Sequence, residues 1–75
     1  MNRRPVSSSN IAGIGWAAGE AGDDTGTLEV EFRSGHLYQY EGVSEAEYRT
    51  LLGASSVGKL LNENIIGRFP EQRLK

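Results

Sequence analysis

The fold is decided by residues 27–40, which read TLEVEFRSGHLYQY. Within Thr27–Arg33, leucine, valine and phenylalanine alternate with charged side chains. This period of two is typical of a strand that buries one face. Ser34–Gly35 interrupts the alternation with residues that favour a turn. Because His36–Tyr40 then resumes a strand-like pattern, we predict an antiparallel hairpin over the whole stretch.

Two registers of this hairpin compete. A two-residue loop at Ser34–Gly35 would place both tyrosines of the second strand beside glutamates of the first. A three-residue loop, with Gly35 in a left-handed conformation within a bulge, pairs Val30 with Tyr38. The second register gathers Leu28, Val30, Phe32, Tyr38 and Tyr40 on one face. Since each buried apolar side chain is worth roughly 1.5–3 kcal/mol, we predict the second register.

The residues on either side extend this pattern. Ile11–Trp16 is a short apolar stretch with two glycines, which predicts a first strand. The Gly-rich segment Ala17–Gly26 has no periodicity and is predicted to be an exposed loop. Downstream, Ser44 and Glu47 form the capping-box pattern S-x-x-E, which predicts a helix that ends near Gly53.

A second helix is predicted to begin at an N-cap supplied by Ser55 or Ser56 and to end near Gly67. Its apolar residues, Val57 and Leu61 among them, share one helical face. We therefore predict an α+β fold in which a three-stranded antiparallel sheet is packed by two short C-terminal helices, in the order β-β-β-α-α.

The length of 75 residues fits one domain with a small interior. We expect residues 1–75 to form this domain, with a core of about 6–69 and flexible ends at 1–5 and 71–75. Hydrophobic residues make up 37% of the chain, and no apolar run approaches the ~20 residues of a membrane span. We expect a cytoplasmic monomer that does not bind membranes.

Charge is unevenly distributed along the chain. Residues 11–47 carry eight acidic side chains and one basic side chain, Arg33, whereas residues 1–10 carry Arg3 and Arg4. Residues 48–75 are mildly basic, and the isoelectric point of the whole chain is about 5.3. This balance argues against sequence-independent binding to phosphate, which needs clustered lysine and arginine.

Several catalytic chemistries are not supported by the residues present. The chain has no cysteine, which excludes disulfides and thiol nucleophiles, and His36 is its single histidine. Gly13 and Gly15 do not match a phosphate-binding fingerprint, and Asp23 and Asp24 lack the pattern of a Ca²⁺ loop. We expect a protein that is not an enzyme, with no catalytic residue, no metal and no cofactor.

Tyr38 and Tyr40 lie on one face of their strand because they are two residues apart. Such a pair is typical of a core beneath helices, and it also resembles a surface on which nucleic-acid bases stack. Lys59 and Asn62 belong to the polar side of the second helix, with Arg68 just beyond. For RNA binding, the candidate residues are Trp16, Tyr38, Tyr40, Lys59, Asn62 and Arg68.

Residues 6–69 resemble the KTSC domain, a short module that stands alone in bacteria and phages or follows some lysyl-tRNA synthetases. The resemblance rests on the Y-x-Y at Tyr38–Tyr40 and the S-x-G-K…N pattern from Ser56 to Asn62. Trp16 stands where tyrosine is more usual in the family, and Phe69 stands where tyrosine is also common. The resemblance implies RNA binding, the role usually suggested for this family.

We predict a non-catalytic binding module that acts on the transcription or translation machinery by docking on a protein partner. RNA polymerase is an example if a phage encodes the chain, by analogy with other small acidic phage proteins. The predicted partner-binding residues are Arg3, Arg4, Val6, Ser7, Ser8, Ser9 and Asn10. The alternative is direct binding of single-stranded RNA or tRNA.

Overall fold

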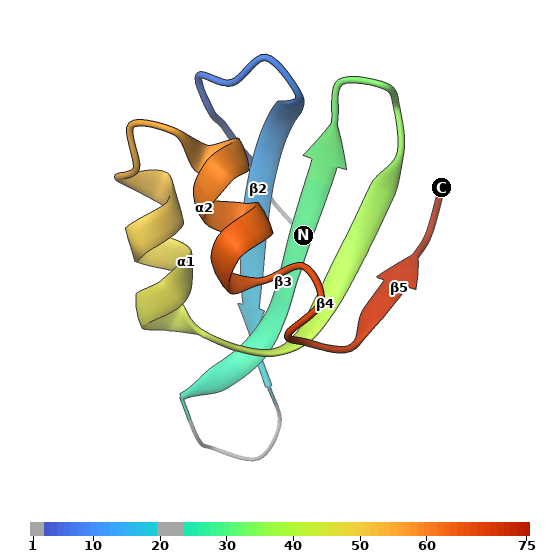
Figure 1. Ribbon diagram of the computed structural model, residues 1–75. Coiled ribbons are helices and arrows are strands. Elements are labelled where there is room, and N and C mark those ends of the chain that lie inside the picture. The colour runs from blue at the N-terminus through green and yellow to red at the C-terminus, as the bar shows by residue number, and fades with distance from the viewer. Residues whose placement is uncertain (1–2, 20–23) are drawn as a thin grey trace.

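The computed structural model describes residues 3–19 and 24–75. Its strands are β1 (Arg4–Pro5), β2 (Ile11–Ala18), β3 (Thr25–Phe32), β4 (Leu37–Ser44) and β5 (Glu71–Arg73), and its helices are α1 (Glu45–Leu52) and α2 (Val57–Asn64). The strands form one antiparallel sheet in the order β1-β2-β3-β4-β5, and both helices lie between β4 and β5 in the chain (Figure 1).

The prediction of an α+β fold with two helices is confirmed, but the sheet has five strands and not three. The two unpredicted strands, β1 and β5, come from the segments expected to be flexible ends. Both are short and exposed, and they join the sheet through backbone hydrogen bonds. Since such strands need no alternation of apolar side chains, the periodicity that revealed β3 could not reveal them.

The predicted loop at Ala17–Gly26 is also shorter than expected. β2 continues to Ala18, and β3 begins at Thr25. Gly26 is buried, and a Cβ atom there would lie 2.1 Å from the Ala17 carbonyl oxygen and 2.9 Å from the ring of Trp16, which leaves no room for a larger residue. The central part of the predicted loop, with Asp23, lies outside the described residues.

The predicted hairpin register is confirmed. Val30 pairs with Tyr38 and Leu28 pairs with Tyr40. Gly35 has a φ of 97°, the left-handed conformation that the three-residue loop requires, and its N–H donates to the carbonyl of Phe32 at 3.0 Å. The register follows from burial, since the side chains of Leu28, Val30 and Tyr40 are almost fully inaccessible.

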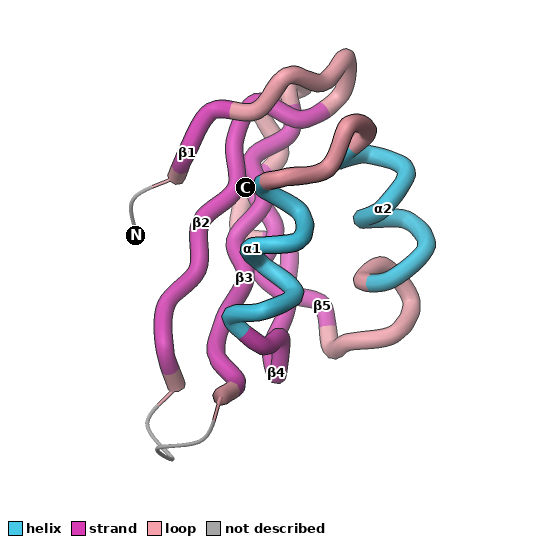
Figure 2. Tube along the Cα trace, turned by 90° about the vertical axis from the view of Figure 1, so that its left-hand side faces the viewer, coloured by secondary structure: helices cyan, strands magenta, loops and turns pink. Residues whose placement is uncertain are grey.

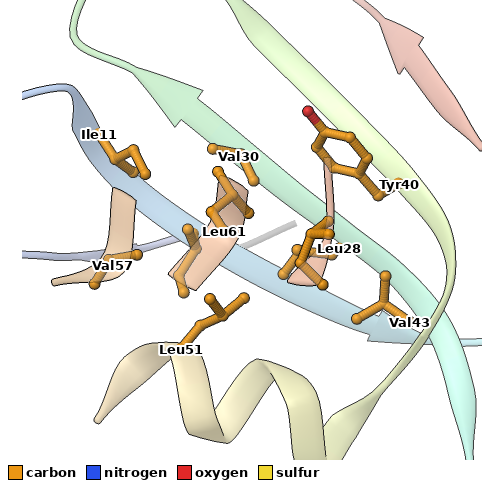
Figure 3. Packing of buried hydrophobic residues seen from close by; sticks show 10 residues of the cluster. Ile11, Leu28, Val30, Tyr40, Val43, Leu51, Val57 and Leu61 are labelled. Atoms are coloured by element: carbon orange, nitrogen blue, oxygen red, sulfur yellow. The ribbon is translucent and has the colours of Figure 1, made fainter. Parts of the chain in front are cut away.

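The helices cover one face of the sheet and leave the other open (Figure 2). The buried apolar side chains are Ile11, Ile14, Leu28, Val30, Tyr40, Val43, Leu51, Val57, Leu61 and Ile65. Leu51 of α1 and Leu61 of α2 face Leu28 and Val30 of the sheet (Figure 3). The core therefore lies in a single layer between the helices and the central strands.

The two helices begin in different ways. At α1, Ser44 Oγ accepts from the Glu47 N–H at 3.1 Å and the Glu47 carboxylate accepts from the Ser44 N–H, which confirms the predicted capping box. At α2, the N-cap is Ser56, one of the two predicted residues, but its side chain makes no capping hydrogen bond. The hydroxyl of Ser56 thus does not stabilise its own helix.

Candidate functional site

A polar hollow of about 340 Å³ lies between the β1–β2 connection and the beginning of α2. Its lining residues are Ser7, Ser8, Ser9, Asn10, Ser55, Ser56, Val57, Gly58, Lys59 and Asn62. We call this the polar hollow. It joins segments that are far apart in the chain and offers hydroxyl, amide and ammonium groups, with no carboxylate among its lining residues.

The wall of the polar hollow from the β1–β2 connection is held in place by hydrogen bonds. Ser8 Oγ accepts from the backbone N–H groups of Asn10 and Ile11, both at 3.2 Å, which closes a turn before β2. Arg33 donates its Nε–H to the Ser8 carbonyl and its backbone N–H to the Asn10 carbonyl, both at 2.8 Å. This wall is therefore ordered, and the exposed Ser7 and Ser9 are presented on it.

A second hollow, of about 300 Å³, lies beside β4, between the β3–β4 turn and the chain that follows α2. Its lining residues are Phe32, Ser34, His36, Tyr38, Tyr40, Ile66 and Glu71, and we call it the aromatic hollow. The Phe32 and Tyr38 rings meet edge to face with centroids 5.5 Å apart. The Tyr38 and Tyr40 rings are nearly parallel, with centroids 6.4 Å apart.

The two tyrosines of the Y-x-Y pattern have different environments. Tyr40 is only 1% exposed, and its hydroxyl donates to Glu71 Oε1 at 2.8 Å. Burial, followed by the interaction with the Glu71 carboxylate, raises the pKa of Tyr40 above its ordinary value, so the phenol stays neutral. Tyr38 is half-buried and leaves part of its ring open to the aromatic hollow.

The structure does not bring Trp16 together with the two tyrosines. Trp16 pairs with Leu28, and Leu28 pairs with Tyr40, so a buried leucine separates the indole from the phenol. The indole N–H instead donates to the Val43 carbonyl at 2.8 Å, and the ring stacks on Tyr48 with centroids 6.5 Å apart. These two contacts hold the half-buried Trp16 against β4 and α1, away from the aromatic hollow.

The predicted partner-binding segment is divided between two places. Arg3 forms ion pairs with Glu29 and Glu31 on the open face of the sheet, and Arg4 belongs to the exposed strand β1. Val6 packs against the core. The remaining residues, Ser7, Ser8, Ser9 and Asn10, line the polar hollow.

The predicted RNA-binding residues are divided as well. Lys59 and Asn62 line the polar hollow opposite Ser7–Asn10, whereas Tyr38 and Tyr40 line the aromatic hollow. Arg68 lines neither hollow, and its Nε–H donates to the Glu63 carbonyl at 2.8 Å. The polar hollow therefore combines part of each predicted set in a single surface.

The basic ends of the chain do not form a common patch. Arg4 lies in β1 and Arg73 lies in β5, which are the opposite edges of the sheet.

The sequence did not predict Phe32 and Glu71 as lining residues of the aromatic hollow. Glu71 carried no signal, because its segment has no periodicity from which a strand could be inferred.

Comparison with known proteins identifies the family. The model of the KTSC domain matches residues 7–69. This chain belongs to the KTSC domain family. It is 36% identical over 63 residues to an uncharacterized protein of Stutzerimonas stutzeri strain A1501, covering 84% of this chain and 82% of the relative.

This KTSC domain is also similar to a solved structure. A crystal structure of a KTSC domain protein from Yersinia pestis is 35% identical and superimposes with a TM-score of 0.85. The match covers 99% of this chain and 97% of the other. The five-stranded sheet with two helices on one face is therefore the architecture of a KTSC domain.

Two further observations bear on the kind of site. Over residues 3–19 and 24–75, no group of three or more histidine, cysteine, aspartate or glutamate side chains is placed to hold a metal ion. In the same part of the chain, neither helix has the length and apolar character that crossing a membrane requires.

Proposed function

We propose that this KTSC domain is a non-catalytic binding module that docks on a protein component of the transcription or translation machinery in the cytoplasm. The observation that carries the proposal is the polar hollow, where Ser7–Asn10 meets Lys59 and Asn62. An ordered surface with many hydroxyl and amide groups suits the backbone and side-chain oxygens of a partner protein.

The groups in the polar hollow support binding rather than catalysis. Among the described residues that line the polar hollow, Lys59 is the one that is ionisable, so the serines have no histidine or carboxylate beside them within the hollow. A serine nucleophile needs a general base within hydrogen-bond distance. The hydroxyls therefore serve best as donors and acceptors to a bound partner.

The charges near the polar hollow favour a protein partner over bare RNA. Lys59 lines the hollow, and Arg33 contacts its wall at Ser8 and Asn10. Two cations release few counterions from a phosphate backbone, so affinity for RNA through this surface alone is expected to be weak at physiological salt. A partner that presents backbone carbonyls and a small number of carboxylates matches these groups better.

The test is capture from a nuclease-treated bacterial lysate, with the bound proteins identified by mass spectrometry. We expect the intact domain to retain a transcription or translation component, and the variant Lys59→Gln with Asn62→Ala to lose it. Lys75→Gln is the control, since it removes the same charge from an exposed residue outside the hollow. Equal capture by both variants, or capture that nuclease abolishes, contradicts the proposal.

Single-stranded RNA binding is the second candidate, and the aromatic hollow is the observation that favours it. Arg33 links the two hollows, since its N–H donates to Asn10 of the polar hollow and its neighbours Phe32 and Ser34 line the aromatic one. A strand of RNA needs this combination of polar groups for its backbone and a ring for a base. NMR titration with single-stranded RNA at low and high salt tests it, and no shift at Tyr38 at low salt contradicts it.

A further inference from the structure

The aromatic hollow has the composition of a site for a flat ring. Its volume of about 300 Å³ is at the lower end of the range for small-molecule pockets, which gives space for one ring system. Phe32 and Ile66 form apolar walls, and the half-buried ring of Tyr38 is accessible from inside. A planar group that stacks on an aromatic side chain is the ligand that such walls accept.

A carboxylate is held at the edge of the hollow. Glu71 Oε1 accepts from the Tyr40 hydroxyl at 2.8 Å, and Tyr40 itself is buried in the core. The position of the carboxylate is thus fixed by a hydrogen bond, while the residue remains exposed. A carboxylate offers only acceptors, so it selects a ring edge that carries N–H donors.

We infer that the aromatic hollow binds the base of a guanine nucleotide, stacked on Tyr38 and hydrogen-bonded to Glu71. Guanine has two adjacent N–H donors on its Watson–Crick edge, which match the two oxygens of a carboxylate. Adenine and cytosine have one amino group next to an acceptor nitrogen that a carboxylate repels. Uracil has a single N–H between two carbonyl oxygens.

The guanidinium of an arginine from a partner protein has an arrangement of N–H donors similar to that of guanine. The positive charge of Arg73 favours the neutral base over this cation. Arg73 pairs across the sheet with Tyr38, and its Nη2 lies 3.0 Å from Nδ1 of His36, a lining residue. An arginine from a partner protein would bring a second positive charge to this rim. The phosphate of a nucleotide would instead be attracted to Arg73, so a nucleotide is expected to bind more tightly than its nucleoside.

This inference goes beyond protein docking and deepens the second candidate function, since the same base can belong to a free nucleotide or to an RNA strand. The two sources differ in the need for the polar hollow. Lys59→Gln is expected to weaken the binding of an RNA strand without changing the binding of a free nucleotide. The binding of GMP can therefore be judged separately, even if protein docking or the binding of an RNA strand fails.

The experiment is an NMR titration of the labelled domain with GMP, AMP, CMP and UMP, and with a short single-stranded RNA that contains one guanine. We expect GMP to shift the amide signals of Phe32, Tyr38 and Glu71, with an affinity about tenfold higher than that of the other three nucleotides. Arginine methyl ester is added as a separate ligand, because stronger binding of this cation would overturn the inference.

Two variants test the named contacts. Glu71→Gln is expected to weaken GMP binding about tenfold by replacing one acceptor oxygen with a donor, and Tyr38→Leu about tenfold by removing the stacking ring. Glu63→Gln is the matched control, because it makes the same charge change at an exposed residue outside the aromatic hollow. The inference is overturned if the four nucleotides bind equally, if none shifts these signals, or if Glu63→Gln has the effect of Glu71→Gln.

Discussion

The guanidinium of Arg3 forms an ion pair with the carboxylate of Glu29, which belongs to β3 and lies two strands away. The intervening strand β2 has Gly13 and Gly15 opposite Glu31 and Glu29, so it has no side chain in the way of this contact. Glu29 is only 5% exposed, and its other oxygen accepts from Gln39 at 3.1 Å. Gly13 and Gly15 thus leave space for the ion pair between Arg3 and Glu29, which connects the N-terminal segment to the sheet.

Replacement of Arg3 tests this contact. Arg3→Ala leaves the buried carboxylate of Glu29 without its cation, and we expect the free energy of unfolding to fall by about 2 kcal/mol in urea denaturation. The neighbouring Arg4→Ala removes the same charge from an exposed residue, with an expected change within about 0.5 kcal/mol. Glu29→Gln added to Arg3→Ala is expected to recover part of the loss. Equal effects of Arg3→Ala and Arg4→Ala would show that the ion pair with Glu29 does not stabilise the fold.

The role of Gly13 is tested by Gly13→Ala. A Cβ atom at this position would lie 3.0 Å from the Arg4 carbonyl oxygen and 3.5 Å from Arg3 Cβ, so the backbone of β1 must shift by a few tenths of an ångström. We expect a loss of stability of about 1–3 kcal/mol in thermal or urea unfolding. Gly53→Ala is the comparison, because its nearest atom would be 3.7 Å away and its φ is −90°. A Gly13→Ala protein as stable as Gly53→Ala would show that β1 does not need the close approach.

The two helix N-termini predict unequal effects of the same substitution. Ser44→Ala removes the hydroxyl that accepts from the Glu47 N–H but keeps the backbone N–H that donates to the Glu47 carboxylate, and we expect a loss of about 1 kcal/mol. Ser56→Ala removes no capping hydrogen bond, so its stability is expected to be close to that of the intact domain. The measurement is chemical denaturation of the two variants side by side, and equal losses would be the opposite of the expected result.

Tyr40 predicts a change of stability at alkaline pH. Its pKa is raised in the folded state, so the unfolded chain releases this proton first. The contribution of the neutral phenol is fully present below about pH 10 and is lost as the pH rises further towards the folded-state pKa. We expect the intact domain to lose more stability between about pH 9 and pH 11 than Tyr40→Phe, which has no such proton. Parallel pH profiles of the two proteins would contradict this.

The hairpin and the helices could be predicted because their signals are carried by side chains. The alternation in Thr27–Arg33 determined which face of β3 is buried, and the Ser44–Glu47 pattern located the beginning of α1. The edge strands could not be predicted in the same way. β5 is exposed and polar, and it joins β4 through backbone pairing and the hydrogen bond from Tyr40 to Glu71, neither of which leaves a periodic apolar pattern in the sequence.

The candidate site could be predicted only in parts. Ser7–Asn10 and Lys59 were each singled out, but for different functions, since nothing in their spacing shows that they share a hollow. Their meeting depends on the packing of α2 against the sheet. Trp16 was named with the tyrosines as a candidate for RNA binding, but it lies apart from them, because Leu28 on the intervening strand separates Trp16 from Tyr40.

We propose that the polar hollow is the docking surface of this KTSC domain. Its most direct test is NMR mapping of the labelled domain against the protein component captured from nuclease-treated lysate, purified free of RNA. We expect the amide signals of residues 7–10 and 55–62 to shift most and Lys59→Gln with Asn62→Ala to abolish these shifts. Shifts confined to the open face of the sheet or to β5, with the polar hollow unchanged, would contradict it.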